Sequence, residues 1–189
     1  MKKKVKVKTG YSYDNNENRK FVAQLLSQKN IVIFTDGGAL GNPGKGGYGA
    51  VLQFLKDGTI IRKEISGGFR ETTNNRMELL AIIEALKSIK SSSIPISVFS
   101  DSKYVIDAIN LGWAKKWQKN SWIKSNKEEA KNIDLWKELL ALIDQQKINF
   151  YWVKGHANIV ENERCDELAN IVMKGKISKI DTYYEEVQR

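Results

Sequence analysis

Four carboxylates occupy places where hydrophobic patterns predict neighbouring strands and helices. Asp36 interrupts or ends an apolar strand, and Asp101 ends another. Glu78 and Asp166 lie beside the apolar faces of predicted helices. Any one such acid is most often an ion-pair partner or a helix cap, but four that cluster raise one another's pKa unless cations lie among them. Because Mg²⁺ prefers oxygen ligands and also accepts phosphate oxygens, the set indicates a magnesium site.

The elements that must position these acids alternate in type along the chain. Three strands come first, the second and third meeting at Asp57-Gly58, a dipeptide suited to a tight hairpin turn. Helical spacing then recurs from Leu79 to Leu86. Further strands are predicted over 94–101 and 147–153, and further helices over 102–110, through 135–143 and through 165–172. The order β-β-β-α-β-α-α-β-α predicts an α/β fold with a mixed sheet, antiparallel first and parallel afterwards.

Composition narrows the class of protein. A chain of 189 residues is long enough for one domain with a real core. The formal net charge of +9 favours a polyanionic partner, nucleic acid above all. The single cysteine excludes an internal disulfide, and no apolar run approaches the roughly 18 residues of a membrane span. The start of the chain is basic but lacks a secretory signal's apolar region, so we expect a cytoplasmic protein without a membrane partner.

The stretch GKGGYG, over 44–49, fits a fingerprint of dinucleotide-binding loops. That fingerprint requires a helix directly after the glycines, because the helix N-terminus holds the phosphates. Two strand patterns follow here instead. A P-loop is excluded too, since Gly46 occupies the place of the magnesium-binding Ser or Thr. We therefore interpret the stretch as a glycine-rich turn between strands.

His156, the only histidine, lies in a polar loop directly before the predicted helix of Asp166. A loop histidine often has no chemical role, although an imidazole can exchange a proton at neutral pH. Cys165 lies nine residues further on. One cysteine and one histidine cannot form a tetrahedral zinc site, and the apolar face around Cys165 predicts a core position.

Several motifs together resemble type 1 ribonuclease H of the bacterial kind. They are TDGGALGNPGKGGYGA, TTNNRMELLA, FSDSKYV, GWAKKWQKNSW, NIDLW and KGHANIVENERCDELA, in the family's order. The resemblance runs from about Ile31 to Lys174, and DTYY over 181–184 is similar to the family's tail. It implies a five-stranded mixed sheet flanked by helices and cleavage of the RNA strand of an RNA/DNA hybrid. We expect a basic extension of unsettled order over 1–30, a catalytic domain over 31–175 and a tail over 176–189.

The resemblance also implies roles for the acids. The family's acidic tetrad falls on Asp36, Glu78, Asp101 and Asp166. These would hold two Mg²⁺ ions, with Mn²⁺ able to substitute, one ion activating water and the other stabilising the leaving oxygen. Asp36 would contact both ions, Glu78 and Asp101 would complete the nucleophile's side, and Asp166 would serve the leaving group. The products would carry a 5′-phosphate and a 3′-hydroxyl, and His156 would assist proton transfer or product release.

Two regions are expected to bind the hybrid. By resemblance, the first contacts backbone, sugar hydroxyls and base edges through Asn42, Thr73, Asn74 and Asn75. Thr73 or a neighbour is also expected to cap the helix that follows. The second is a basic protrusion gripping the DNA strand, with candidate contacts Trp113, Lys115, Lys116, Trp117 and Lys119. Tryptophans at helical spacing also pack cores, and lysine runs are often merely solvated. Ala39 and Lys103 depart from residues common in the family and affect substrate grip more than chemistry.

Two alternatives remain at this point. A degenerate member of the fold would bind hybrids without cutting them, but its signature is a lost carboxylate, and all four are present. A resolvase or transposase domain of the same fold would act on DNA, but the TTNN motif and the basic protrusion belong to the hybrid-cutting branch. We expect a monomer whose partner is an RNA/DNA hybrid, with no obligatory protein partner.

Overall fold

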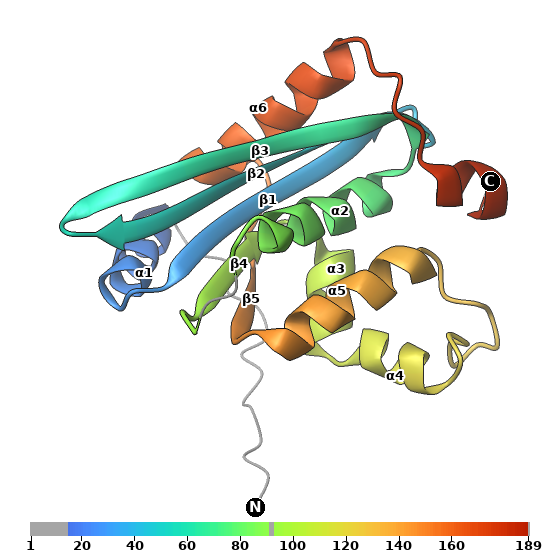
Figure 1. Ribbon diagram of the computed structural model, residues 1–189, viewed down its shortest axis with the longest axis horizontal. Helices are drawn as coiled ribbons and strands as arrows, with labels where there is room; N and C mark the ends of the chain where they lie inside the picture. Colours follow the sequence, from blue (N-terminus) through green and yellow to red (C-terminus); the bar gives the residue numbers. More distant parts are fainter. Residues whose placement is uncertain (1–14, 91–92, 189) are drawn as a thin grey trace, which may run out of the picture.

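The computed structural model describes residues 15–90 and 93–188, so residues 1–14 of the expected extension lie outside the described part. Figure 1 shows one mixed sheet with helices on both faces. The elements, in chain order, are α1 (Asn15–Ser27), β1 (Ile31–Leu40), β2 (Gly44–Lys56), β3 (Thr59–Thr72), α2 (Asn74–Lys87), β4 (Ile96–Ser100), α3 (Lys103–Asn110), α4 (Trp113–Lys119), α5 (Ile133–Gln145), β5 (Ile148–Trp152), α6 (Val160–Lys174) and the short π-helix η1 (Tyr184–Gln188).

The five strands lie in the order β3-β2-β1-β4-β5. β1 pairs antiparallel with β2 and β2 with β3, whereas β4 is parallel to both β1 and β5. The predicted meander followed by parallel crossovers is thus confirmed. The predicted hairpin at Asp57-Gly58 is also present, and both residues take positive φ, 49° and 77°. Aspartate and glycine tolerate that conformation better than other residues, which explains the sharp reversal there.

Three elements fall outside the predicted order. α1 forms within the extension whose order the sequence left open. α4 is separate from α3 because Gly112 takes a left-handed φ of 74° between them. η1 forms in the tail after α6. The GKGGYG stretch was misassigned as a turn: it lies in β2, and residues 41–43 make the turn.

Each face of the sheet has its own core. On one face, α2, α3 and α5 pack against alternate strand residues such as Ile33 and Val98, around the fully buried Trp136. On the other face, α1 and α6 cover Val32, Phe34 and Phe99. Figure 1 shows α6 across the sheet from α2 and α5. Alternation of side chains along a strand requires both faces of these inner strands to be apolar, as the sequence shows.

A buried ion pair ties the C-terminal segment to α2. Arg76 is 2% exposed, and its guanidinium donates to Asp181 Oδ2 at 2.6 Å and to Asp134 Oδ2 at 2.7 Å. Thr72 Oγ1 also donates to Asp181 Oδ2, at 2.7 Å. The Tyr183 ring lies 5.2 Å from the guanidinium. Because a buried charge without its partner is costly, these contacts hold the start of α2, the start of α5 and the C-terminal segment together.

Candidate functional site

Asp36 and Asp101 emerge at the same edge of the sheet. The parallel ladder between β1 and β4 ends at the pair Thr35 and Ser100, and each aspartate follows directly. Open α/β sheets bind ligands at the carboxyl ends of such strands. Trp152 Nε1 donates to the main-chain oxygen of Asp101 at 3.0 Å, which fixes the chain as it leaves β4.

Glu78 reaches this edge because α2 crosses β1 at a glycine. A Cβ atom at Gly37 would lie 2.4 Å from the Met77 carbonyl carbon and 2.7 Å from the Glu78 nitrogen. Only a residue without a side chain allows two backbones to approach this closely. Ser102 Oγ, at the N-cap of α3, then donates to Glu78 Oε2. Glu78 is therefore hydrogen-bonded to Ser102, the residue that follows Asp101.

Asp166 lies on α6, which packs closely against the opposite face of the sheet. A Cβ atom at Gly49 would lie 2.3 Å from the Cys165 carbonyl oxygen, and one at Gly47 2.5 Å from that of Ala169. The glycines of β2 thus let α6 lie directly on the strand. Cys165 is fully buried and its thiol donates to the Phe34 carbonyl, which confirms the predicted core position. Its neighbour Asp166 is near enough to Asp36 to raise the pKa of that carboxyl group.

Burial and mutual repulsion raise the pKa of three of these carboxyl groups. The pKa of Asp36 rises to about 8, first because it is buried and then because Asp101, Asp166 and Glu78 are near, although the Gly37 amide donates to it at 2.7 Å. Burial and Asp101 raise the pKa of Glu78 to about 7, against the hydrogen bond from Ser102. Burial also raises the pKa of Asp101, and Asp166 adds to the rise. The four predicted acids are therefore electrostatic neighbours.

Two asparagines missed in the sequence hold the acids from α6. Asn162 Nδ2 donates to Asp101 Oδ2 at 3.4 Å, and Asn170 Nδ2 donates to Asp166 Oδ1 at 2.9 Å. Asn162, Asp166 and Asn170 recur every four residues, which places them on one helix face. In the sequence, this spacing of polar residues beside the apolar face of the predicted helix could have indicated both asparagines. Ser102, directly after Asp101, was also missed.

The carboxylate oxygens of these acids are suitable ligands for a divalent cation, although the side chains do not converge on a single position. Across residues 15–90 and 93–188, no three acidic, histidine or cysteine side chains are placed to hold a single ion. Each acid instead accepts a hydrogen bond from a neighbour, such as Ser102 or Asn170. Mg²⁺ commonly uses only one or two carboxylates together with water and substrate phosphate, so a closed cage is not required. The raised pKa values show repulsion that a cation would offset.

His156 lies in the exposed turn between β5 and α6, with a φ of 51°. The turn passes close to Asp101, because a Cβ atom at Gly155 would lie 2.5 Å from Asp101 Oδ2. His156 is near enough to contribute to a lower pKa of that carboxyl group, against the larger effect of burial. The structure thus brings the turn that carries His156 close to Asp101.

The start of α2 carries the first group of candidate substrate contacts. Thr73 occupies the N-cap position, but its side chain makes no capping hydrogen bond. Asn42 performs that role from the turn between β1 and β2, since its Oδ1 accepts from the Asn74 amide at 3.0 Å. Asn74 Oδ1 in turn accepts from the Ala39 amide at 2.6 Å, and Asn75 is exposed. The expected cap at Thr73 is therefore corrected to a long-range cap by Asn42.

Comparison with known proteins identifies the fold and the family. Residues 28–174 match the family described as RNase H. The chain belongs to the ribonuclease H family. Ribonuclease H of Syntrophus aciditrophicus is 52% identical over 142 residues, which cover 75% of this chain and 79% of that protein. Ribonuclease H of Rippkaea orientalis is 52% identical over 143 residues, 76% and 85% of the two chains.

Solved structures of the ribonuclease H family agree. LC9-RNase H1, a type 1 enzyme with the type 2 active-site motif, has a TM-score of 0.70 at 26% identity, over 85% of this chain and 82% of that one. LC11-RNase H1 in complex with RNA/DNA hybrid has a TM-score of 0.59 at 26% identity, over 77% and 97%. The protein is therefore an enzyme of the nuclease class. In the described part of the chain, no helix is both long and apolar enough to cross a membrane.

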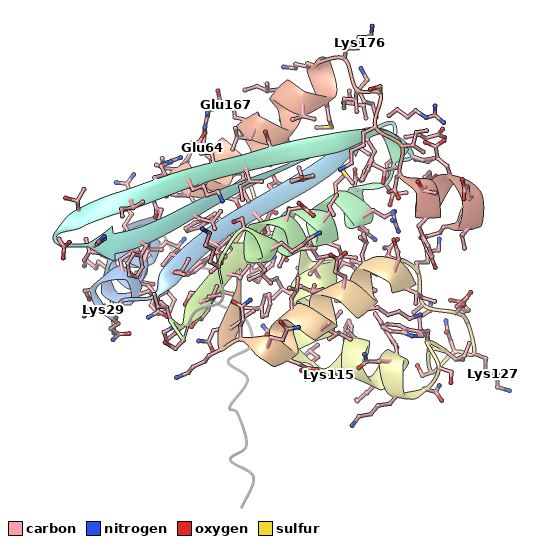
Figure 2. The ribbon with its side chains drawn as sticks, viewed as in Figure 1. Lys29, Glu64, Lys115, Lys127, Glu167 and Lys176 are labelled. Atoms are coloured by element: carbon pink, nitrogen blue, oxygen red, sulfur yellow. The ribbon has the colours of Figure 1, made fainter. Side chains whose placement is uncertain are left out.

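The basic protrusion of this ribonuclease H family member comprises α4 and the loop that follows it, residues 112–127. Trp117 packs edge-on against Trp136 at 5.9 Å, whereas Trp113 is 42% exposed. A cleft of about 590 Å³ opens beside both rings and is lined by Trp113, Lys116, Trp117, Asn120, Ile123, Lys124, Ser125 and Asn126. Lys115 turns away and pairs with Asp144 at 2.8 Å. Lys119 is exposed, and Figure 2 shows Lys115 and Lys127 at the outer surface of this region.

Proposed function

We propose that this protein hydrolyses the RNA strand of RNA/DNA hybrids and leaves 5′-phosphate and 3′-hydroxyl ends. The observation that carries the proposal is the meeting of four acids from four separate parts of the fold at the carboxyl edge of β1 and β4. Membership of the ribonuclease H family and the likeness to LC11-RNase H1, which binds a hybrid, support it. We further propose that the enzyme acts as a monomer in the cytoplasm.

Asp36, Glu78, Asp101 and Asp166 are the residues that would hold two Mg²⁺ ions, or Mn²⁺ in their place. When bound, the ions would supply the charge that activates water and stabilises the leaving oxygen. The charges of the other three acids each raise the pKa of Asp36, so we place Asp36 at the centre of the set. Its carboxyl group and that of Glu78 must each give up a proton before they bind a cation, because burial favours their neutral forms.

His156 would assist proton transfer during cleavage of the RNA strand. Its imidazole lies in a solvent-exposed turn, where water can deliver and remove protons, and it neighbours Asp101.

The hybrid would lie across α2 and the basic protrusion. At the start of α2, Asn42, Thr73, Asn74 and Asn75 would meet the phosphates and the sugar hydroxyls, since a helix N-terminus favours anions. The 2′-hydroxyl group distinguishes RNA from DNA there. In the protrusion, Trp113, Lys115, Lys116, Trp117 and Lys119 would contact the DNA strand, mainly through its phosphates.

The decisive test compares substrates and metals. The protein is incubated with end-labelled RNA/DNA hybrid, double-stranded RNA and double-stranded DNA, with Mg²⁺ and with EDTA. Asp101→Asn tests the metal site, and Asp107→Asn on α3 is the matched control. We expect cleavage of the RNA in the hybrid alone, lost with EDTA and in Asp101→Asn but retained in Asp107→Asn. Binding without cleavage, or cleavage of double-stranded DNA, would contradict the proposal.

A further inference from the structure

α1 lies outside residues 28–174, which match the ribonuclease H family, yet it packs on the strands that carry the acids. Its apolar side contributes the buried Leu25 and Leu26 and the partly buried Phe21 and Val22 to the smaller core. The same core contains Phe34 of β1 and Phe99 of β4. α1 therefore packs beside α6 on the same face of the sheet, against strands that carry the acids.

A row of stacked aromatic rings connects three strands beneath α1. Phe34, Phe99 and Tyr151 are register partners in β1, β4 and β5. Neighbouring rings are stacked at 4.8 Å and 5.0 Å between centroids. Phe21 of α1 meets this row edge-on, 6.1 Å from Phe99 and 5.2 Å from Tyr151. Edge-to-face contacts of this kind have a preferred geometry, so Phe21 restricts where the two rings can lie.

The row lies directly behind the candidate site. Phe34 precedes Asp36 by two residues, and Phe99 precedes Asp101 by two residues. The turn that carries His156 begins and ends in the same core, because Val153 on one side and Ile159 on the other are both buried there. A displacement of Phe99 or Tyr151 would therefore change the position of Asp101 relative to His156.

A cleft lies between part of α1 and the end of the turn that carries His156. It has a volume of about 310 Å³ and lies between Val22, Ala23 and Leu26 of α1 and the segment 158–161. Asn158 and Val160 of that segment are exposed. Phe21 and the turn nevertheless share one core, which also holds Tyr151, Val153 and Ile159.

We infer that Phe21 is a positioning residue for the reaction, acting through Phe99 and Tyr151 on the spacing of Asp101 and His156. The inference rests on the proposed function for its kinetic consequence. Phe21 itself lies in the core behind the strands, against Phe99 and Tyr151. Its effect should accordingly fall on turnover rather than on substrate binding.

Phe21→Ala is the direct test, with Leu25→Ala as the matched control one turn further along α1. We expect Phe21→Ala to lower kcat about threefold to tenfold with KM within about twofold. Phe21→Tyr keeps the ring and should restore kcat. Leu25→Ala should lower the Tm comparably and leave kcat unchanged. An equal kcat for the two alanine variants would overturn the inference.

A second measurement does not depend on cleavage. Hydrogen exchange of the amides over 153–159, followed by mass spectrometry, should accelerate in Phe21→Ala and not in Leu25→Ala. If the wild-type protein does not cut hybrids, the proposed function fails and this exchange still decides the positioning role. Should Phe21→Ala not fold, Ala23→Leu replaces it: the larger side chain fills the cleft and should slow the exchange. Unchanged exchange in the folded variants would refute the inference.

Discussion

Asp36 and Gly49 face each other across the antiparallel pair of β1 and β2, and α6 lies against the sheet at Gly49. A Cβ atom there would come within 2.3 Å of the Cys165 carbonyl oxygen and 2.8 Å of Leu168 Cβ. Asp166 follows Cys165 directly. The separation of Asp36 from Asp166 is therefore set by the missing side chain at residue 49.

Gly49→Ala should push α6 away from β2. We expect a loss of about 1–3 kcal/mol in the free energy of unfolding, as for other overpacked interiors. Cleavage of the hybrid should also slow, because Asp166 moves with the helix. Gly38→Ala is the control, since a Cβ atom there meets nothing closer than 3.8 Å. Urea unfolding and cleavage rates decide, and equal behaviour of the two variants would contradict the packing argument.

Asp36→Asn should stabilise the metal-free protein in a pH-dependent way. The folded-state pKa of Asp36 is raised from 3.8 to about 8, so the wild type loses stability as pH rises through that interval. Asparagine carries no charge and escapes the loss. We expect the variant to gain about 1–3 kcal/mol at pH 8 and above, and almost nothing at pH 4. Urea unfolding in EDTA measures the difference.

Two controls accompany the Asp36 measurement. Asp57→Asn, in the exposed hairpin turn, should leave the pH dependence unchanged. Added Mg²⁺ should raise the Tm of the wild type at pH 8 but not that of Asp36→Asn. A gain that is constant between pH 4 and pH 9 would show that burial and repulsion are not its cause.

Replacing Lys115, Lys116 and Lys119 by alanine should weaken binding and reduce its dependence on salt. Each lost phosphate contact removes about 0.9 from the slope of log affinity against log salt, so the slope should fall by about two to three. The lower figure applies if Lys115 stays paired with Asp144. KM should rise while kcat stays unchanged. The variant with Lys20, Lys29 and Lys56 replaced has the same net charge, and an identical slope in both variants would eliminate the protrusion as a binding site.

His156→Ala should slow turnover without abolishing it. The acids remain, so the reaction continues with water as the proton carrier, at a rate lower by about a hundredfold or more. The dependence of kcat on pH between 6 and 9 should change, because the variant lacks the group proposed to transfer the proton. Lys154→Ala, two residues earlier in the same turn, is the control. Unchanged turnover of His156→Ala across this pH range would refute its role.

The mixed sheet, antiparallel first and parallel afterwards, was predictable from local patterns, and the grouping of the four acids was predicted from their positions and the family's motifs. Parallel strands that end together place Asp36 and Asp101 at one edge of the sheet, regardless of the conformation of the loops. The cap of α2 could not be found in this way. Thr73 has the right residue type and backbone, yet Asn42, over thirty positions away, makes the hydrogen bond. A turn that folds back onto a helix is a tertiary contact, which local propensity does not encode.

The glycines of β2 were misassigned for the same reason. Gly47 and Gly49 resemble turn residues in the sequence, but they lie in a strand and are needed because α6 crosses there. α1 was left open because its sequence is largely polar and its large apolar residues, Phe21, Val22, Leu25 and Leu26, find their partners only in the tertiary core. Asn162 and Asn170, by contrast, were available from their spacing around Asp166.

The Arg76 ion pairs bear on how the enzyme meets its substrate. Arg76 follows Asn75 directly and is fixed by Asp134 and Asp181, so the start of α2 is immobilised on two sides before any duplex arrives. The conformational entropy of that surface has been lost on folding. If the hybrid binds there as proposed, docking would demand little further ordering of the protein, and the free energy of contact would contribute to affinity.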